Sequence, residues 1–241
     1  WQATAAKIEE HPDVVASAPY IEAQALLIAG SKSSGAAITG VLAEHERKVT
    51  SITEKMASGS FEALEPGSYG IVLGSELAKA LGVSLDDRVI VVTSLRNTTP
   101  VGVMPRHRVF KVVGIFNAEM YEFDRNMAYV NMEDAARLYR MGDQVTGVRL
   151  KLSDMFLAPR LVRELALSLG GGYYIDDWPR NHANFFRSIQ LTKSAMFLIL
   201  LLVVAVAAFN IVSTLVMVVK DKRADIAILR TIRASPRGIL K

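Results

Sequence analysis

Two kinds of hydrophobic pattern follow one another along the chain. From residue 5 to residue 176, apolar stretches switch between the two-residue period of strands and the longer period of amphipathic helices. The pattern predicts strands at 16–29, 35–42, 70–74, 88–94, 108–116, 127–130, 145–152 and 173–176. It predicts helices at 5–10, 75–81, 132–140 and 157–169, and a polar segment of helix and loops at 44–60. Ser75 is expected to cap the second helix and Gly82 to end it. This part should fold as an α+β domain.

The second pattern is a continuous apolar run at 195–219, which contains no charged residue. At about 1.5 Å per residue the run exceeds the roughly 30 Å of a bilayer's hydrocarbon core, so we expect a transmembrane helix. A buried helix of a soluble core is the alternative, although such helices rarely reach this length without a charge. Residues 181–194 lead into the run without glycine or proline, which predicts that the helix continues outward as a stalk. An ordinary linker helix without a role in transmission remains the alternative.

The charges on either side of this helix predict how it is oriented in the membrane. Residues 220–241 carry seven Lys or Arg against two Asp, an excess of +5, whereas the whole chain is +4. Residues 1–194 therefore carry 28 − 7 = 21 basic and 24 − 2 = 22 acidic groups, a net charge of −1. By the positive-inside rule, the tail is cytoplasmic and residues 1–194 lie on the opposite side of the membrane. The nearly neutral charge of residues 1–194 also argues against a nucleic-acid surface there.

The sequence contains no recognisable catalytic pattern. Cysteine is absent, so no disulfide or thiolate is available, and the four histidines have no metal-ligand spacing among themselves. The glycines at 170–172 lack the pattern of a phosphate-binding loop and indicate a turn. We therefore expect no enzyme activity, no metal and no cofactor bound by this chain.

Two segments have the pattern of contact sites. The first is the basic amphipathic segment at 220–235, whose apolar face consists of Ile226, Ile228, Leu229 and Ile232, with arginines such as Arg230 elsewhere. Such a helix either lies on anionic lipid or inserts its apolar face into a soluble partner, and composition leaves both possibilities open.

The second segment is 96–108, a predicted hairpin tip between two strands. Its tip consists of Pro100, Val101, Gly102, Val103, Met104 and Pro105. Arginines at 96, 106 and 108 lie at its base. Apolar residues clustered with arginine on a loop favour a contact site, and a merely long hairpin is the alternative.

Three stretches carry a family resemblance: LEPGSYGIVLGSELAKALGVSLDDRVIVV, TPVGVMPRHRVFKVVGIF and VAVAAFNIVSTLVMVVKDKRADIAILRTIRASPRGI. With these stretches in this order over nearly the whole chain, it resembles the LolC/LolE/LolF membrane subunits of the bacterial lipoprotein-releasing ABC transporter, within the MacB/FtsX superfamily. The chain departs from the family at Arg233, where glycine is common, which affects the turn expected after the coupling helix.

The resemblance implies a division of the chain. A periplasmic porter-like domain would comprise 1–59 and 131–180, with a strand-rich Sabre-like insertion at 60–130. A stalk at 181–194, a transmembrane helix at 195–219 and a cytoplasmic coupling region at 220–241 would follow. The hook near 96–108 would bind a periplasmic chaperone through Pro100, Val101, Gly102, Val103, Met104, Pro105, Arg106, His107 and Arg108. Coupling to the ATPase would use Ile226, Ile228, Leu229, Arg230 and Ile232.

The function implied is that of a non-catalytic subunit in the bacterial inner membrane. Its partners would be a LolD-like ATPase that holds ATP and Mg, a LolE-like second subunit or a second LolF-like copy, and a LolA-like chaperone. The cargo would be a triacylated lipoprotein taken from membrane lipid. A MacB-like efflux subunit and an FtsX-like scaffold that signals to a cell-wall hydrolase are the alternatives. Because the chain starts at Trp1 without an initiator methionine, we expect a fragment flanked by further helices.

Overall fold

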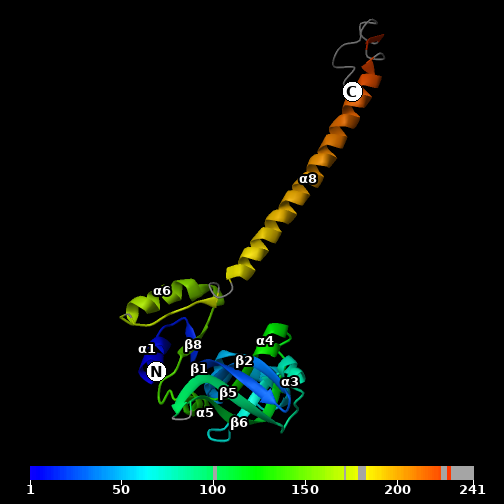
Figure 1. Cartoon of the computed structure of the whole chain (residues 1–241). Helices are drawn as coiled ribbons and strands as arrows, with labels where there is room; N and C mark the ends of the chain where they lie inside the picture. Colours follow the sequence, from blue (N-terminus) through cyan, green and yellow to red (C-terminus); the bar gives the residue numbers. More distant parts are fainter. Residues whose placement is uncertain (100–101, 171, 179–182, 224–226, 229–241) are drawn as a thin grey trace. The chain divides into compact units, whose positions relative to one another are not determined.

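A computed structural model describes residues 1–99, 102–170, 172–178, 183–223 and 227–228. The chain divides into two compact units, Trp1–Ile175 and Asp176–Lys241, and each is described by itself (Figure 1). The first unit holds all the described strands, and the second holds the long helix α8.

The centre of the first unit is a closed ring of six strands. They are β1 (Val14–Ala29), β2 (Lys32–Val41), β7 (Met127–Asn131), β4 (Gly70–Gly74), β6 (Gly102–Phe116) and β5 (Arg88–Thr99), in the order in which neighbours pair. The ring closes because β1 pairs with β2 on one side and with β5 on the other. The β2–β7 and β4–β6 pairs are parallel and the other four pairs are antiparallel. The labelled strands curve around one another in Figure 1.

Two further strands extend this barrel. Strand β8 (Gly147–Leu152) pairs with the first half of β1, and the short β3 (Met56–Gly59) pairs with the end of β6. With 16 residues, β1 is long enough to pair with β8 along its first half and with barrel strands along its second half.

The core consists of three clusters that follow the alternation of the strands. Ile71 and Leu73 of β4 face the barrel interior, together with Phe110 of β6 and residues of α3 (Ser75–Leu81) and α5 (Met132–Tyr139). Val72, between them in β4, belongs to a second cluster on the outer face, where residues such as Phe61 cover the sheet. Strand β4 is thus buried on both faces, as its uninterrupted apolar sequence indicates.

The third cluster joins the two ends of the unit. Ile8 of α1 (Gln2–Glu9) and Val14 of β1 pack with Leu161 and Leu165 of α6 (Ala158–Ser168). Figure 1 shows α1, α6 and β8 together, away from α3 and α4. The shorter elements are α2 (Ala43–Val49), α4 (Tyr121–Asn126) and the 3₁₀ turns η1 (Ile52–Lys55) and η2 (Met155–Leu157).

The second unit contains α8 (Ala183–Asp221), a helix of 39 residues. Its span Asn184–Asp221 is long and apolar enough to cross a membrane by length and composition. The predicted continuity of stalk and apolar run is confirmed from Ala183 onward, whereas 181–182 lie outside the described residues.

Most predicted elements are present, and several details differ, among them helix α4, which was not predicted. Gly74, not Ser75, is the N-cap of α3, and no side chain caps that end, so the predicted Ser75 cap is wrong. The predicted strand at 173–176 is wrong, because the described residues there form no strand. The segment 44–60 contains the unpredicted strand β3, whereas Gly82 ends α3 as expected, with a φ of 70° in the left-handed region.

Candidate functional site

The β5–β6 hairpin carries most of the predicted contact residues. Its antiparallel register runs from Arg88 opposite Lys111 to Val92 opposite His107, shifts, and resumes from Arg96 opposite Pro105 to Thr99 opposite Gly102. The predicted hairpin is therefore confirmed, and its strands extend further toward the tip than expected. Pro100 and Val101 lie outside the described residues, and the backbone of Gly102, Val103, Met104 and Pro105 belongs to β6.

Arg108 is anchored at the base of this hairpin. Its Nη2 donates a hydrogen bond of 3.0 Å to Tyr69 Oη, and its guanidinium carbon lies 4.6 Å from the centre of the Tyr69 ring. The Tyr69 ring in turn packs edge-on against Phe110, with 5.5 Å between the centroids. This contact combines a hydrogen bond with a cation–π interaction and limits the positions open to the guanidinium. The hairpin thus presents a positive charge in a defined place.

Tyr69 itself is fixed through its backbone. Its N–H donates to Asp134 Oδ2 at 3.1 Å, and the N–H of Gly67 donates to Asp134 Oδ1 at 3.0 Å. The N–H of Lys111 donates to the Tyr69 carbonyl at 2.9 Å. Tyr69 has a φ of 52°, a left-handed conformation that is unusual for a residue other than glycine and needs such support. Asp134 is fully buried, so α5 and β6 together set the position of Tyr69.

The alternation of β6 separates the predicted basic residues. Arg106 and Arg108 point to one side of the hairpin, and His107 points to the other. His107 is exposed, whereas Arg106 is half-buried and its Nη1 has no hydrogen-bond partner among the described residues. The three residues expected to act together therefore divide between two faces.

The coupling segment lies mostly outside the described residues. Ile226, Leu229, Arg230 and Ile232 all lie there, and Ile228 is helical and exposed. Its predicted role is therefore not tested by geometry.

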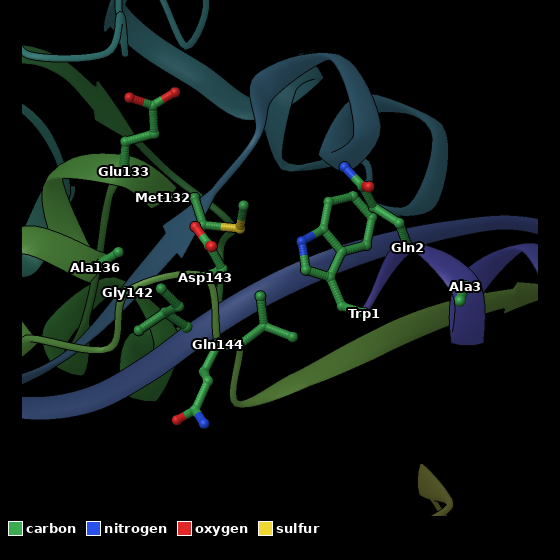
Figure 2. A pocket seen from close by; sticks show the side chains of 11 residues that line it. Trp1, Gln2, Ala3, Met132, Glu133, Ala136, Gly142, Asp143 and Gln144 are labelled. Carbon is green, nitrogen blue, oxygen red and sulfur yellow. The ribbon is translucent and has the colours of Figure 1, made fainter.

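A pocket of about 560 Å³ lies elsewhere on the first unit. Figure 2 shows the Trp1 indole facing Met132 and Asp143, and Glu133 also contributes to the lining. None of the predicted contact residues lines this pocket. Among the residues that the structure describes, no group of three or more His, Asp or Glu side chains is placed to hold a metal ion.

A buried ion pair also escaped the sequence analysis. Glu46 of α2 is fully buried and bonded to Arg149 of β8, whose guanidinium lies 5.1 Å from the centre of the Tyr20 ring. Burial raises the pKa of the Glu46 carboxyl, and the pairing with Arg149 lowers it by less. Burial likewise raises the pKa of the nearby Tyr129 to about 12. The pair connects α2 to the strand outside the barrel, which is a structural role.

Comparison with known proteins identifies the fold as that of a family. The family model of the MacB-like periplasmic core domain matches residues 1–166. The chain belongs to this family. The crystal structure of the periplasmic region of MacB from Actinobacillus actinomycetemcomitans has the same fold, with a TM-score of 0.50 and 15% identity, over 78% of this chain and 82% of that one.

The resemblance to the LolC/LolE group within this superfamily is confirmed by curated relatives. The lipoprotein-releasing system transmembrane protein LolC of Xylella fastidiosa (strain 9a5c) is 47% identical over 100% of this chain and 58% of its own length. The corresponding LolE of Haemophilus influenzae is 34% identical over 98% of this chain and 56% of its own length. The chain thus spans less than two thirds of these relatives.

Sequence reasoning missed Tyr69 and Asp134. The stretch PGSYG before a strand was a signal that the backbone turns sharply there, and an aspartate in the first turn of α5 was a candidate for backbone contacts. Neither signal says that the two residues meet, because they are 65 positions apart.

Proposed function

We propose that the chain is part of a non-catalytic membrane subunit of an inner-membrane ABC transporter that releases lipoproteins to a periplasmic chaperone. The observation that carries the proposal is the 47% identity, over the full length of this chain, with a protein named for lipoprotein release. The ATPase activity would belong to a partner chain with its own ATP and Mg. A second membrane subunit, LolE-like or a LolF-like copy, would complete the complex.

In this proposal, residues 1–194 are periplasmic and the tail is cytoplasmic. At about 1.5 Å per residue, the 39 residues of α8 measure about 58 Å, nearly twice the roughly 30 Å of the hydrocarbon core. One helix is therefore long enough to cross the membrane and to extend beyond it as a stalk. The movement of the ATPase would enter through the coupling residues and pass along this helix.

The hairpin is the proposed contact for the chaperone. The anchored Arg108, the half-buried Arg106 and the β5–β6 pairing that resumes beyond its register shift support a rigid presentation, which reduces the ordering cost of binding. The finer division into porter-like parts and a Sabre-like insertion belongs to the same proposal. The third core cluster supports it in part, because it packs residues near both ends of the unit together.

The test is to delete Pro100–Met104 and titrate the assembled transporter with the chaperone by calorimetry. The register leaves Arg96 opposite Pro105 after the deletion, with Asn97–Thr99 as a three-residue connection, so the barrel should stay folded. We expect chaperone binding to be lost. Unchanged affinity would reject the hook and favour the efflux or scaffold alternatives.

A second arm examines the arginines. Combining Arg106→Ala with Arg108→Ala should weaken chaperone binding and reduce its dependence on salt, because rim charges act mainly on the rate of association. A matched change on an exposed arginine at the far end of the same strand pair, Arg88→Ala, should have a smaller effect.

A third arm concerns the ATPase. Leu229→Asp would place a charge in the proposed apolar contact and should detach the ATPase during purification. Retention of the ATPase by this variant would favour binding of the segment to lipid instead.

A further inference from the structure

The pocket of Figure 2 lies between the first turn of α1, the beginning of α5 and the loop that follows α5. Its volume of about 560 Å³ falls within the range that is usual for small-molecule sites. None of the residues assigned to the hairpin or to the coupling segment lines it. The pocket is thus large enough for a small molecule and separate from the proposed contacts with other proteins.

Hydrogen bonds fix two walls of this pocket. At the start of α5, the side chain of Asn131 accepts a hydrogen bond from the N–H of Glu133 at 2.9 Å. At the end of the loop after α5, the N–H of Thr146 donates to the carbonyl of Tyr20 in β1 at 3.0 Å. Ile21, the next residue of β1, lines the pocket and is 1% exposed. These walls keep their positions without a ligand, which lowers the ordering cost of binding one.

The Trp1 indole forms a further wall. Its ring packs edge-on against His45 of α2, with 6.3 Å between the centroids. The Trp1 carbonyl accepts a hydrogen bond from the N–H of Ala5 at 2.8 Å, which ties the residue to α1. Figure 2 shows the indole facing Met132 and Asp143. An aromatic ring is therefore held at the pocket, with apolar and acidic side chains opposite it.

Both charged side chains that line the pocket, Glu133 and Asp143, are carboxylates. Glu133 is shared with Arg137 at 3.4 Å, whereas no cation of the described part of the chain forms an ion pair with Asp143. The electron-rich face of an indole attracts a cation, and a carboxylate attracts it as well. The same groups repel an anion. A bare metal ion would gain nothing from the indole, because it prefers oxygen ligands in larger number.

We infer that this pocket binds a small organic cation, an alkylammonium or quaternary ammonium compound. The ammonium group lies against the Trp1 indole and close to the Asp143 carboxylate. The apolar part of the ligand packs against Met132 and Val145, which also line the pocket. The inference goes beyond the proposed function, because it uses neither the hairpin nor the coupling segment and requires no partner protein.

The experiment titrates the full chain, purified in an uncharged maltoside detergent, by calorimetry. The probes are choline and its neutral isostere 3,3-dimethylbutan-1-ol, which has the same shape but carries a carbon in place of the charged nitrogen. We expect choline to bind with a dissociation constant of about 1 mM, and the isostere to bind about tenfold more weakly.

Three variants locate the binding. Trp1→Leu removes the aromatic face and keeps an apolar side chain, and Asp143→Asn removes the charge and keeps the shape. Each should weaken choline binding about tenfold, and Asp143→Asn should leave the binding of the isostere unchanged. Glu122→Gln is the control, because it makes the same change of charge at an exposed residue of α4 that does not line the pocket. It should bind choline like the parent.

Several results would overturn the inference. Equal affinity for choline and the isostere would show an apolar cavity without preference for a cation. Absence of binding at choline concentrations up to about 50 mM would show that the pocket is not a cation site. Equal weakening by Asp143→Asn and Glu122→Gln would show a general effect of net charge. An unchanged unfolding temperature of Trp1→Leu and Asp143→Asn checks that both variants are folded.

Discussion

Asp134 holds the segment that supports the hairpin base, and its removal gives a quantitative test of that arrangement. The buried carboxylate accepts hydrogen bonds from Gly67 and Tyr69 at 3.0 and 3.1 Å. Asp134→Ala leaves both N–H groups without this acceptor, at a cost of about 1–3 kcal/mol for each group that stays buried. Gly67 is exposed, so water can reach its N–H, whereas Tyr69 is half-buried. We therefore expect a loss of about 2–3 kcal/mol in the free energy of unfolding.

Two further variants show whether the hydrogen bonds are the cause. Asp134→Asn keeps one acceptor oxygen and should lose about half as much, about 1–1.5 kcal/mol. Glu133→Ala removes the neighbouring exposed partner of Arg137, at 3.4 Å, and should cost less than about 0.5 kcal/mol. Arg137 also lies 3.6 Å from Asp134, but it is more than half exposed, so this pair adds little.

The assay is urea unfolding of the first unit, Trp1–Ile175, combined with amide hydrogen exchange at Gly67 and Tyr69. In Asp134→Ala both amides should exchange faster than in the parent, beyond the change expected from global destabilisation. A loss of stability no greater than that of Glu133→Ala, with unchanged exchange at both amides, would refute the proposed support of the hairpin base.

Three other changes test separate parts of the structure. Gly74→Ala would place a Cβ 2.2 Å from the backbone oxygen of Asp124 and should lower the free energy of unfolding by about 2 kcal/mol. The control Gly35→Ala meets nothing within 4 Å and should be tolerated. Equal unfolding temperatures of the two variants would contradict the close approach at Gly74. Burial raises the pKa of Glu46 above 4.5, so the stability that this residue contributes is lost as the pH rises through its folded-state pKa. The unfolding temperature of the parent minus that of Glu46→Gln should therefore fall from pH 4.5 upward. A constant or rising difference would show that burial does not dominate the pKa of Glu46. A Gly-Gly insertion after Arg187 should uncouple ATP hydrolysis from lipoprotein release in reconstituted vesicles, because each glycine costs about 1 kcal/mol of helix stability. Release at the parent rate would show that a rigid stalk is unnecessary.

Local signals account for the elements that the sequence predicted well. The apolar sequence of 70–74, the periodic segment 132–139 and Gly82 after α3 each specify their structure within a few residues. The prediction of a cap at Ser75 was wrong because the preceding Gly74 adopts the extended conformation of an N-cap, so the helix already begins at Ser75. The strand predicted at 173–176 has the residue types of a strand, but no neighbouring strand pairs with it among the described residues.

The pairing of strands far apart in the chain could not be predicted from the sequence. The ring depends on the second half of β1, which pairs with β2 on one edge and with β5 on the other, while its first half pairs with β8; periodicity does not reveal which strands become neighbours. The candidate site shows the same limit. The hairpin with its arginines was visible as a loop pattern, whereas the separation of His107 from Arg106 and Arg108 required the strand to continue through the predicted loop.

The closed ring has a mechanical consequence for any load on the hairpin. A strand at the edge of an open sheet can peel away with the loss of one row of hydrogen bonds, but β5 and β6 are each bonded to a neighbour on both sides. A pull on the hairpin is therefore shared with β1 and β4, and through them with the whole circuit. Such a barrel resists shear, so a load at the tip would move the barrel as one body instead of bending two strands.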